Sequence, residues 1–96
     1  MKILAMEKEI SNYSDTDFKP HLKAEATRVW ELYQSGVFRE IYFDKNKHNA
    51  IIIMECNDLQ EAEEYLGTLP LVKEELIYFE MIALEAYSGF ARLFGN

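Results

Sequence analysis

The apolar and polar positions of the chain alternate with the two-residue period of strands in some segments and with a helical period in others. Residues 1–8 predict a strand that is apolar on both sides, and residues 11–17 predict a polar loop. Residues 37–43 and 50–56 are strand-like, and the stretch 44–49 between them is polar throughout, which predicts a hairpin. Alternation along the first of these strands places Val37, Arg39, Ile41 and Phe43 on one face and Phe38, Glu40 and Tyr42 on the other.

Residues 18–34 carry the apolar spacing of a helix. Thr16 or Asp17 is the expected cap, Pro20 is tolerable only in the first turn, and Gly36 suits the left-handed end. The stripe expected to face the core consists of Phe18, Leu22, Ala26, Val29 or Trp30, and Tyr33.

A second helix is predicted by the capping box that Asp58 and Glu61 resemble. It is expected to end near Gly67, and residues 72–75 form a short connector with room for one helical turn. Residues 76–87 predict the last strand. The apolar stripe of this helix consists of Leu59, Ala62, Leu66 and Leu69.

The resulting order of elements, β-α-β-β-α-β, is that of the split βαβ, or ferredoxin-like, arrangement. The fold class is therefore α+β, with a four-stranded antiparallel sheet that carries both helices on one face. We expect residues 1–96 to form one domain, because chains of this length rarely divide.

The strands are apolar on both sides, which two short helices on one face do not explain. An antiparallel sheet that faces water on one side alternates apolar and polar residues, whereas Ile51 and Ile53 here alternate with Ile52 and Met54. Left bare, such a face exceeds the apolar patch that soluble monomers expose. We therefore expect a homodimer, or a larger even oligomer, with sheets packed face to face. The tail 88–96 contains Phe90, Leu93 and Phe94 and is expected to dock, with the partner subunit as one candidate surface.

Four short stretches resemble muconolactone isomerase, a family within the small dimeric α+β barrel proteins. They are Leu22-Lys23-Ala24-Glu25, Gly36-Val37-Phe38-Arg39, Thr68-Leu69-Pro70-Leu71 and Ile77-Tyr78-Phe79-Glu80. The chain departs from that family at Ala26, where the family carries a second acid. The resemblance implies a dimeric α+β barrel and, as an activity, cofactor-free isomerisation of a small organic anion.

Charge and composition disfavour several classes of binding partner. Ten Lys and Arg against seventeen Asp and Glu give a net charge of −7, which disfavours nucleic acid and anionic membranes. No apolar run approaches the ~20 residues of a membrane helix. The first six residues before Glu7 are too few for the apolar core of a signal peptide, and Cys56 is the only cysteine, so we expect a cytoplasmic protein.

The sequence contains no Gly-rich phosphate loop, serine elbow or metal-binding motif. The candidate proton carriers are therefore polar residues placed among apolar ones. Glu80 and Glu55 lie on strands with apolar neighbours, which raises the pKa of a carboxyl group and suits proton transfer. His21 sits in the first turn of the first helix. Two histidines, His21 and His48, do not make a metal site, and no cofactor is expected.

Candidate ligand-binding residues are Arg39, Tyr42, Lys23 and Trp30. Arg39 offers a bidentate grip on a carboxylate, and Lys23 matches a lysine of the resembled family. Each also has a structural interpretation: an ion pair for Arg39, a solvated helix face for Lys23, and packing for Tyr42 and Trp30.

The sequence leaves the function open between two main hypotheses. In the first, the protein is a cofactor-free isomerase with a pocket between the first helix and the sheet, where Arg39 orients an anion and Glu80 or His21 moves a proton. In the second, it is a non-catalytic ligand-binding or assembly module. Cofactor-free oxygenation of an aromatic compound also fits the fold, without a distinguishing residue.

Overall fold

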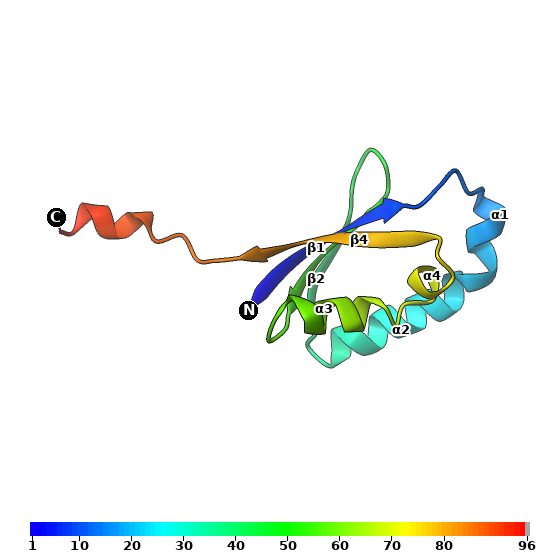
Figure 1. Cartoon of the computed structure of the whole chain (residues 1–96), viewed down its shortest axis with the longest axis horizontal. Coiled ribbons are helices and arrows are strands. Elements are labelled where there is room, and N and C mark those ends of the chain that lie inside the picture. The colour runs from blue at the N-terminus through cyan, green and yellow to red at the C-terminus, as the bar shows by residue number, and fades with distance from the viewer. Residues whose placement is uncertain (96) are drawn as a thin grey trace.

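Four antiparallel strands form one sheet in the order β2-β3-β1-β4, and helices α2, α3 and α4 lie on one of its faces (Figure 1). This computed structural model describes residues 1–95, and the expected α+β, ferredoxin-like fold is confirmed. The strands are β1 (Lys2–Glu9), β2 (Phe38–Phe43), β3 (Ala50–Glu55) and β4 (Ile77–Leu84). The helices are α1 (Asp15–Phe18), α2 (Leu22–Gln34), α3 (Leu59–Leu66) and α4 (Pro70–Lys73), with 3₁₀ turns η1 (Lys19–His21) and η2 (Gly89–Leu93).

The first helical region begins earlier than predicted and is divided into three pieces. Its cap is Ser14, whose backbone N–H donates to the Asp17 carboxylate at 2.8 Å, so Asp17 serves the cap from inside the helix. Pro20 has no N–H to donate to the preceding turn, and the chain forms the 3₁₀ turn η1 there before α2 starts.

The predicted core stripe of α2 is wrong for most of its residues. Leu22, Trp30 and Tyr33 are 51%, 57% and 50% exposed, and the side chain that α2 buries is Leu32. Two polar contacts explain the rotation of the helix. Arg28 Nε donates to Thr68 Oγ1 at 2.8 Å, and Glu25 accepts the backbone N–H of Leu71 at 2.9 Å. Both contacts turn the side of α2 that carries Glu25 and Arg28 toward the segment that contains α3 and α4.

Helix α3 follows its predicted pattern. Asp58 caps it by accepting the backbone N–H of Glu61 at 2.7 Å. Ala62, Leu66 and Leu69 are buried as expected, whereas Leu59 in the first turn is exposed. The expected helical turn after Gly67 is α4, which begins earlier than the predicted connector.

A register shift in β2 changes which side chains face the helices. The shift lies between Phe38 and Glu40, so the strict alternation predicted for this strand is broken. Phe38 pairs with Met54 and Ile41 pairs with Ile52, both buried partners on the helix-covered face. The predicted grouping of Ile41 with Arg39 against Phe38 is therefore wrong.

The core lies between the helices and one face of the sheet. Ile3, Ala5, Ile52 and Met54 point into it from the central strands and are buried. The opposite face, called the open face below, carries the alternate residues, among them Leu4 and Ile53, and no element of residues 1–95 packs over it (Figure 1). The predicted two-sided apolar character of the strands is confirmed.

The C-terminal tail leaves the end of β4 and projects away from the rest of the chain (Figure 1). Tyr87, Phe90, Leu93 and Phe94 are 66–85% exposed, and Tyr87 packs only edge-to-face on Phe90. Residues 88–95 of the tail do not dock on their own chain. Docking on a partner subunit stays a prediction, and Asn96, which belongs to the predicted tail, lies outside the described residues.

Deleting residues 90–96 is expected to leave the fold of the remaining chain intact, because the tail contacts little of it. If the tail docks on a partner, the loss of three large apolar side chains, about 1.5–3 kcal/mol each when fully buried, weakens association. Circular dichroism and sedimentation of the truncated chain check the two parts. Unchanged association would show that the tail is frayed.

Candidate functional site

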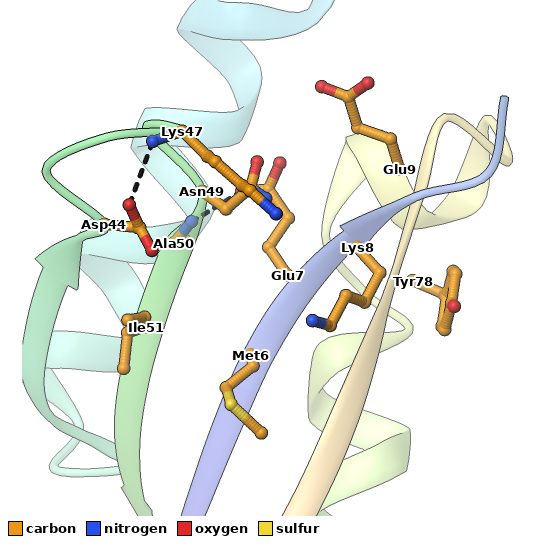
Figure 2. A pocket seen from close by; sticks show the side chains of 10 residues that line it. All are labelled: Met6, Glu7, Lys8, Glu9, Asp44, Lys47, Asn49, Ala50, Ile51 and Tyr78. Atoms are coloured by element: carbon orange, nitrogen blue, oxygen red, sulfur yellow. Dashed lines mark hydrogen bonds between the residues drawn. The ribbon is translucent and has the colours of Figure 1, made fainter. Parts of the chain in front are cut away.

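A pocket lies where β1 and β3 diverge, and we call it the fork pocket. The two strands pair from Lys2 opposite Glu55 to Met6 opposite Ile51, and beyond that point they separate around the hairpin loop (Figure 2). The pocket has a volume of about 570 Å³. Its lining residues are Met6, Glu7, Lys8, Glu9, Asp44, Lys47, Asn49, Ala50, Ile51 and Tyr78.

Glu7 is the half-buried carboxyl group of the fork pocket. Its Oε1 accepts the backbone N–H of Ala50 at 2.8 Å, at the position where the ladder between β1 and β3 has ended. Burial raises the pKa of Glu7, and the charge of Glu9 adds to the rise, while the Ala50 hydrogen bond and His48 oppose it. The side chain therefore replaces a lost ladder bond and holds its proton more readily than an exposed glutamate.

Glu25 is a second half-buried carboxyl group, on α2. Its hydrogen bond to the N–H of Leu71 caps α4, whose own cap residue, Leu69, has no side chain that could do so. Burial is the main cause that raises the pKa of Glu25, and the charge of Glu7 raises it further. The charge of Glu7 therefore reaches Glu25 across the layer between α2 and the sheet.

The rim of the fork pocket carries two lysines and one structural aspartate. Asp44 accepts the backbone N–H groups of Asn46 and Lys47 at 2.7 and 2.9 Å, which fixes the hairpin loop and lowers the pKa of Asp44. The ion pairs among residues 1–95 are Met1–Glu55 and Arg28–Glu31, and neither includes Lys8 or Lys47. Their charges also help to lower the pKa of Asp44.

Replacing Glu25 with glutamine is expected to reduce the pH dependence of stability. Because the pKa of Glu25 is raised by folding, the folded state binds more protons than the unfolded state, and stability falls as pH rises through that pKa. The Glu25→Gln variant keeps an acceptor for Leu71 and loses this cost. Denaturation at pH 7 and at about pH 5 should show a smaller gain on acidification than the wild type has.

Glu25→Ala is the matched control, since it removes the titrating group together with the hydrogen bond. Like Glu25→Gln it is expected to show the smaller gain on acidification, and it should be less stable than Glu25→Gln by about 0.5–1.5 kcal/mol at both pH values. If Glu25→Gln gains as much stability on acidification as the wild type, the role assigned to Glu25 is contradicted.

Two sequence-predicted site residues lie on the open face. Glu80 on β4 pairs with Met6 on β1, and Tyr42 on β2 pairs with Ile51 on β3. Strands β1 and β3 therefore lie between Glu80 and Tyr42. Both are exposed. The Tyr42 hydroxyl donates to the Glu40 carboxylate at 2.6 Å, which raises the pKa of Tyr42.

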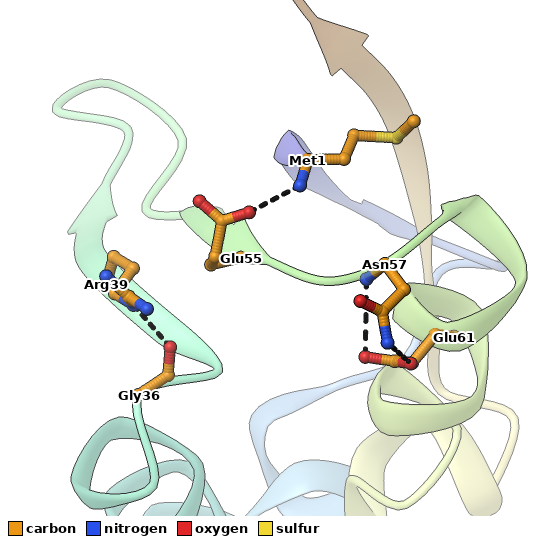
Figure 3. A network of polar contacts seen from close by, with 6 residues as sticks. All are labelled: Met1, Gly36, Arg39, Glu55, Asn57 and Glu61. Carbon is orange, nitrogen blue, oxygen red and sulfur yellow. Dashed lines mark hydrogen bonds and ion pairs between the residues drawn. The ribbon is translucent and has the colours of Figure 1, made fainter.

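Glu55 pairs with Lys2 at the end of the sheet opposite the fork pocket, and Arg39 lies between Phe38 and Glu40 at the same end. Figure 3 shows both side chains. Arg39 Nε donates to the carbonyl of Gly36, the glycine in the left-handed turn that precedes β2. Glu55 pairs with the terminal amine of Met1 at 2.5 Å, and this contact, with help from the charge of Arg39, lowers the pKa of Glu55. A lowered pKa is the reverse of what the sequence pattern indicated for this carboxyl group.

The remaining predicted site residues lie along the first helical region. His21 is half-buried in η1, Lys23 is exposed on α2, and Trp30 is exposed and stacks on Tyr33 at 5.9 Å. None of the seven predicted site residues lines the fork pocket. Their roles stay predictions, and within the chain they do not gather around one cavity.

Sequence reasoning missed Glu7 and noted Glu25 only through the resemblance. The available signal was the phase of β1: Ile3 and Ala5 point into the core, and Glu7 occupies the next position of the same face. A charged residue at a core-facing position is unusual and marks a site to test. Among residues 1–95, no cluster of metal-ligating side chains is found, and no helix is long and apolar enough to cross a membrane.

Comparison with known proteins supports the fold. No family model matches the sequence, and no curated protein matches it. Among solved structures, the chain is similar to 5-chloro-2-hydroxyhydroquinone dehydrochlorinase from Burkholderia phenoliruptrix AC1100, in complex with 2,5-dihydroxybenzoquinone. The TM-score is 0.73 at 14% identity, covering 93% of this chain and 98% of that one. The likeness shows a shared α+β fold.

Proposed function

We propose that this protein is a small-molecule enzyme that moves a proton on a small organic anion, with the fork pocket as its site. The observation that carries the proposal is the half-buried Glu7 carboxyl group on the pocket wall, held by Ala50 through one oxygen. The other oxygen, Oε2, accepts no hydrogen bond among the described residues and is left for a ligand. The resemblance to muconolactone isomerase and the fold shared with a dehydrochlorinase of a small hydroxylated ring support this class of substrate.

The environment of Glu7 suits proton transfer at neutral pH. A carboxyl group whose pKa is raised toward the working pH both accepts and returns a proton efficiently. In the proposed reaction, Glu7 takes a proton from a carbon next to a carbonyl or carboxylate, and the electron pair delocalises as an enolate. Glu7 then returns the proton to a different carbon of the same molecule. The double bond moves and no electron is gained or lost, so the step is an isomerisation.

The two rim lysines suit an anionic substrate. Lys8 and Lys47 line the same pocket as Glu7 and form no ion pair among the described residues, so an incoming carboxylate does not have to displace an ion-pair partner. A lysine beside the reacting carbon also stabilises the charge that develops on the enolate oxygen.

The alternative is a non-catalytic binding or assembly module. It is favoured by a specific observation, the broad apolar open face together with the exposed tail, which are features of an assembling subunit. In that case the Glu7 hydrogen bond to Ala50 serves only to close the end of the β1–β3 ladder.

A thermal-shift screen against lactones, hydroxy acids and dienoic acids tests the proposal. We expect at least one anion to raise the melting temperature by several degrees at saturation, because a ligand stabilises the state that it binds. Lys47→Gln should weaken that shift, and Lys73→Gln, at an exposed site on α4, should not. If no anion stabilises the protein, or if both variants respond alike, the assembly interpretation takes precedence.

A further inference from the structure

The hairpin loop beside the fork pocket turns back toward β3 at His48, which lies in the left-handed backbone region. His48 has a φ of 60°, a conformation that glycine adopts freely and that most side chains adopt at a cost. Its N–H donates to the carbonyl of Asp44 at 2.8 Å, and the N–H of Asp44 donates to the carbonyl of Asn49 at 2.7 Å. Glycine is the usual residue at such a position of a hairpin. A histidine there therefore points to a role for its ring.

The ring of His48 stacks on Phe43, the last residue of β2. The two ring centroids are 3.9 Å apart, and the ring planes differ by 16°. Both side chains are exposed, so the stack lies outside the core. It joins the residue that makes the turn to the strand that precedes the loop, and it therefore opposes opening of the turn.

Ala50, two residues after His48, connects the turn to Glu7. Ala50 pairs with Phe43 on one side, and on the other side its N–H donates to Glu7 Oε1 at 2.8 Å (Figure 2). Phe43, Ala50 and Glu7 share the helix-covered face by register. The charge of His48 is also among the causes that lower the pKa of Glu7, which places the two side chains within electrostatic reach of one another.

His48 does not line the fork pocket, but both of its neighbours in the chain do. The direction of the backbone at His48 sets where Lys47 and Asn49 point. Through the Ala50 N–H, the same turn also fixes one oxygen of Glu7. Three lining residues of the pocket thus depend on one turn, and an open turn would release the bond that orients the carboxyl group.

We propose that His48 is a positioning residue of the fork pocket, whose stack on Phe43 locks the left-handed turn that presents the Ala50 N–H to Glu7. The effect of this lock on turnover rests on the proposed function, whereas the hold on Glu7 does not. The hold is therefore tested without a ligand, and the result is independent of whether Glu7 acts on an anion.

A matched pair of variants at Phe43 tests the lock without changing the backbone preference of residue 48. Phe43→Leu removes the stacking partner, and Phe43→Tyr keeps it. Hydrogen exchange of the Ala50 amide, followed by nuclear magnetic resonance, measures how often the turn opens. We expect several-fold faster exchange in Phe43→Leu and the wild-type rate in Phe43→Tyr. His48→Asn tolerates the left-handed conformation but lacks the ring, so it should exchange as fast as Phe43→Leu.

Two further signals separate a lock from a general loss of stability. The amide of Met54, near the far end of β3, should keep its wild-type exchange rate in every variant. The carboxyl carbon signal of Glu7 should shift in Phe43→Leu and stay in place in Phe43→Tyr, since only the first variant releases the Ala50 bond.

Lys45→Gln is the control for charge, because it removes a positive charge from the same loop at a residue that forms no ion pair among the described residues. It should match the wild type in all three signals. A wild-type Ala50 rate in Phe43→Leu overturns the proposal, and so does an equal acceleration of the Ala50 and Met54 amides.

Discussion

Replacing Ile52 with aspartate is expected to unfold the chain. Ile52 is 2% exposed, and it lies on β3 under the helices, paired with Ala5 on one side and Ile41 on the other. The substitution removes a buried side chain and places an unpaired carboxylate in the core, at a cost of at least about 4 kcal/mol. Total stabilities of about 5–15 kcal/mol leave little margin. Circular dichroism and urea denaturation measure the loss.

The matched substitution one residue later, Ile53→Asp, tests the other face of the sheet. Ile53 points to the open face, so Ile53→Asp is expected to keep the fold of the single chain and to prevent the pairing of two copies that the two-sided apolar strands predict. At micromolar concentration this lowers the melting temperature, because association stabilises the folded state. A folded Ile52→Asp variant would contradict the core described above. A wild-type melting temperature in Ile53→Asp would show that the open face is solvated.

Replacing Glu7 with glutamine is expected to lower turnover of an isomerisable anion by roughly 10²–10⁴-fold, the usual contribution of one acid–base group. Glutamine keeps the shape and an oxygen for the N–H of Ala50, so the end of the ladder and the pocket persist. Binding of the anion should therefore remain while kcat falls, which separates a proton carrier from a residue that only shapes the pocket.

Glu63→Gln, at an exposed site on α3, is the control for Glu7 and should leave turnover unchanged. A Glu7→Gln variant with wild-type kcat would assign the carboxyl group a purely structural role. A variant that loses binding and turnover together would show that Glu7 holds the pocket open rather than moving a proton.

The sequence predicted the fold well because the fold depends on period and caps. The alternation of β1, β3 and β4, the cap at Asp58 and the order of the elements are local signals, and each is present in the structure. The face of α2 was not predictable from period alone. Its apolar arc is wide, and the helix is turned by contacts of Arg28 with Thr68, between α3 and α4, and of Glu25 with Leu71 in α4, which lie 40 and 46 residues away in the chain.

The candidate site was harder to predict because it depends on where strand pairing ends. Glu80 and Glu55 share the neighbours expected of buried carboxylates, yet they point to the open face, where a single chain leaves them accessible. Glu7 shares its face with the buried Ile3 and Ala5, and the hairpin loop opens a pocket beside it. The register shift in β2 similarly turned Arg39 away from its predicted face.

The titration of the Glu7 carboxyl carbon by ¹³C nuclear magnetic resonance tests the central claim most directly. The signal is assigned by its absence in Glu7→Gln and followed with pH, first for the protein alone and then with sorbate, a simple dienoic acid, as the probe. We predict a pKa above the ordinary glutamate value of about 4.3, because burial raises it, and a further change when sorbate binds beside it. A Glu7 signal that titrates at the ordinary value and does not respond to sorbate would contradict the assignment of the fork pocket as the site.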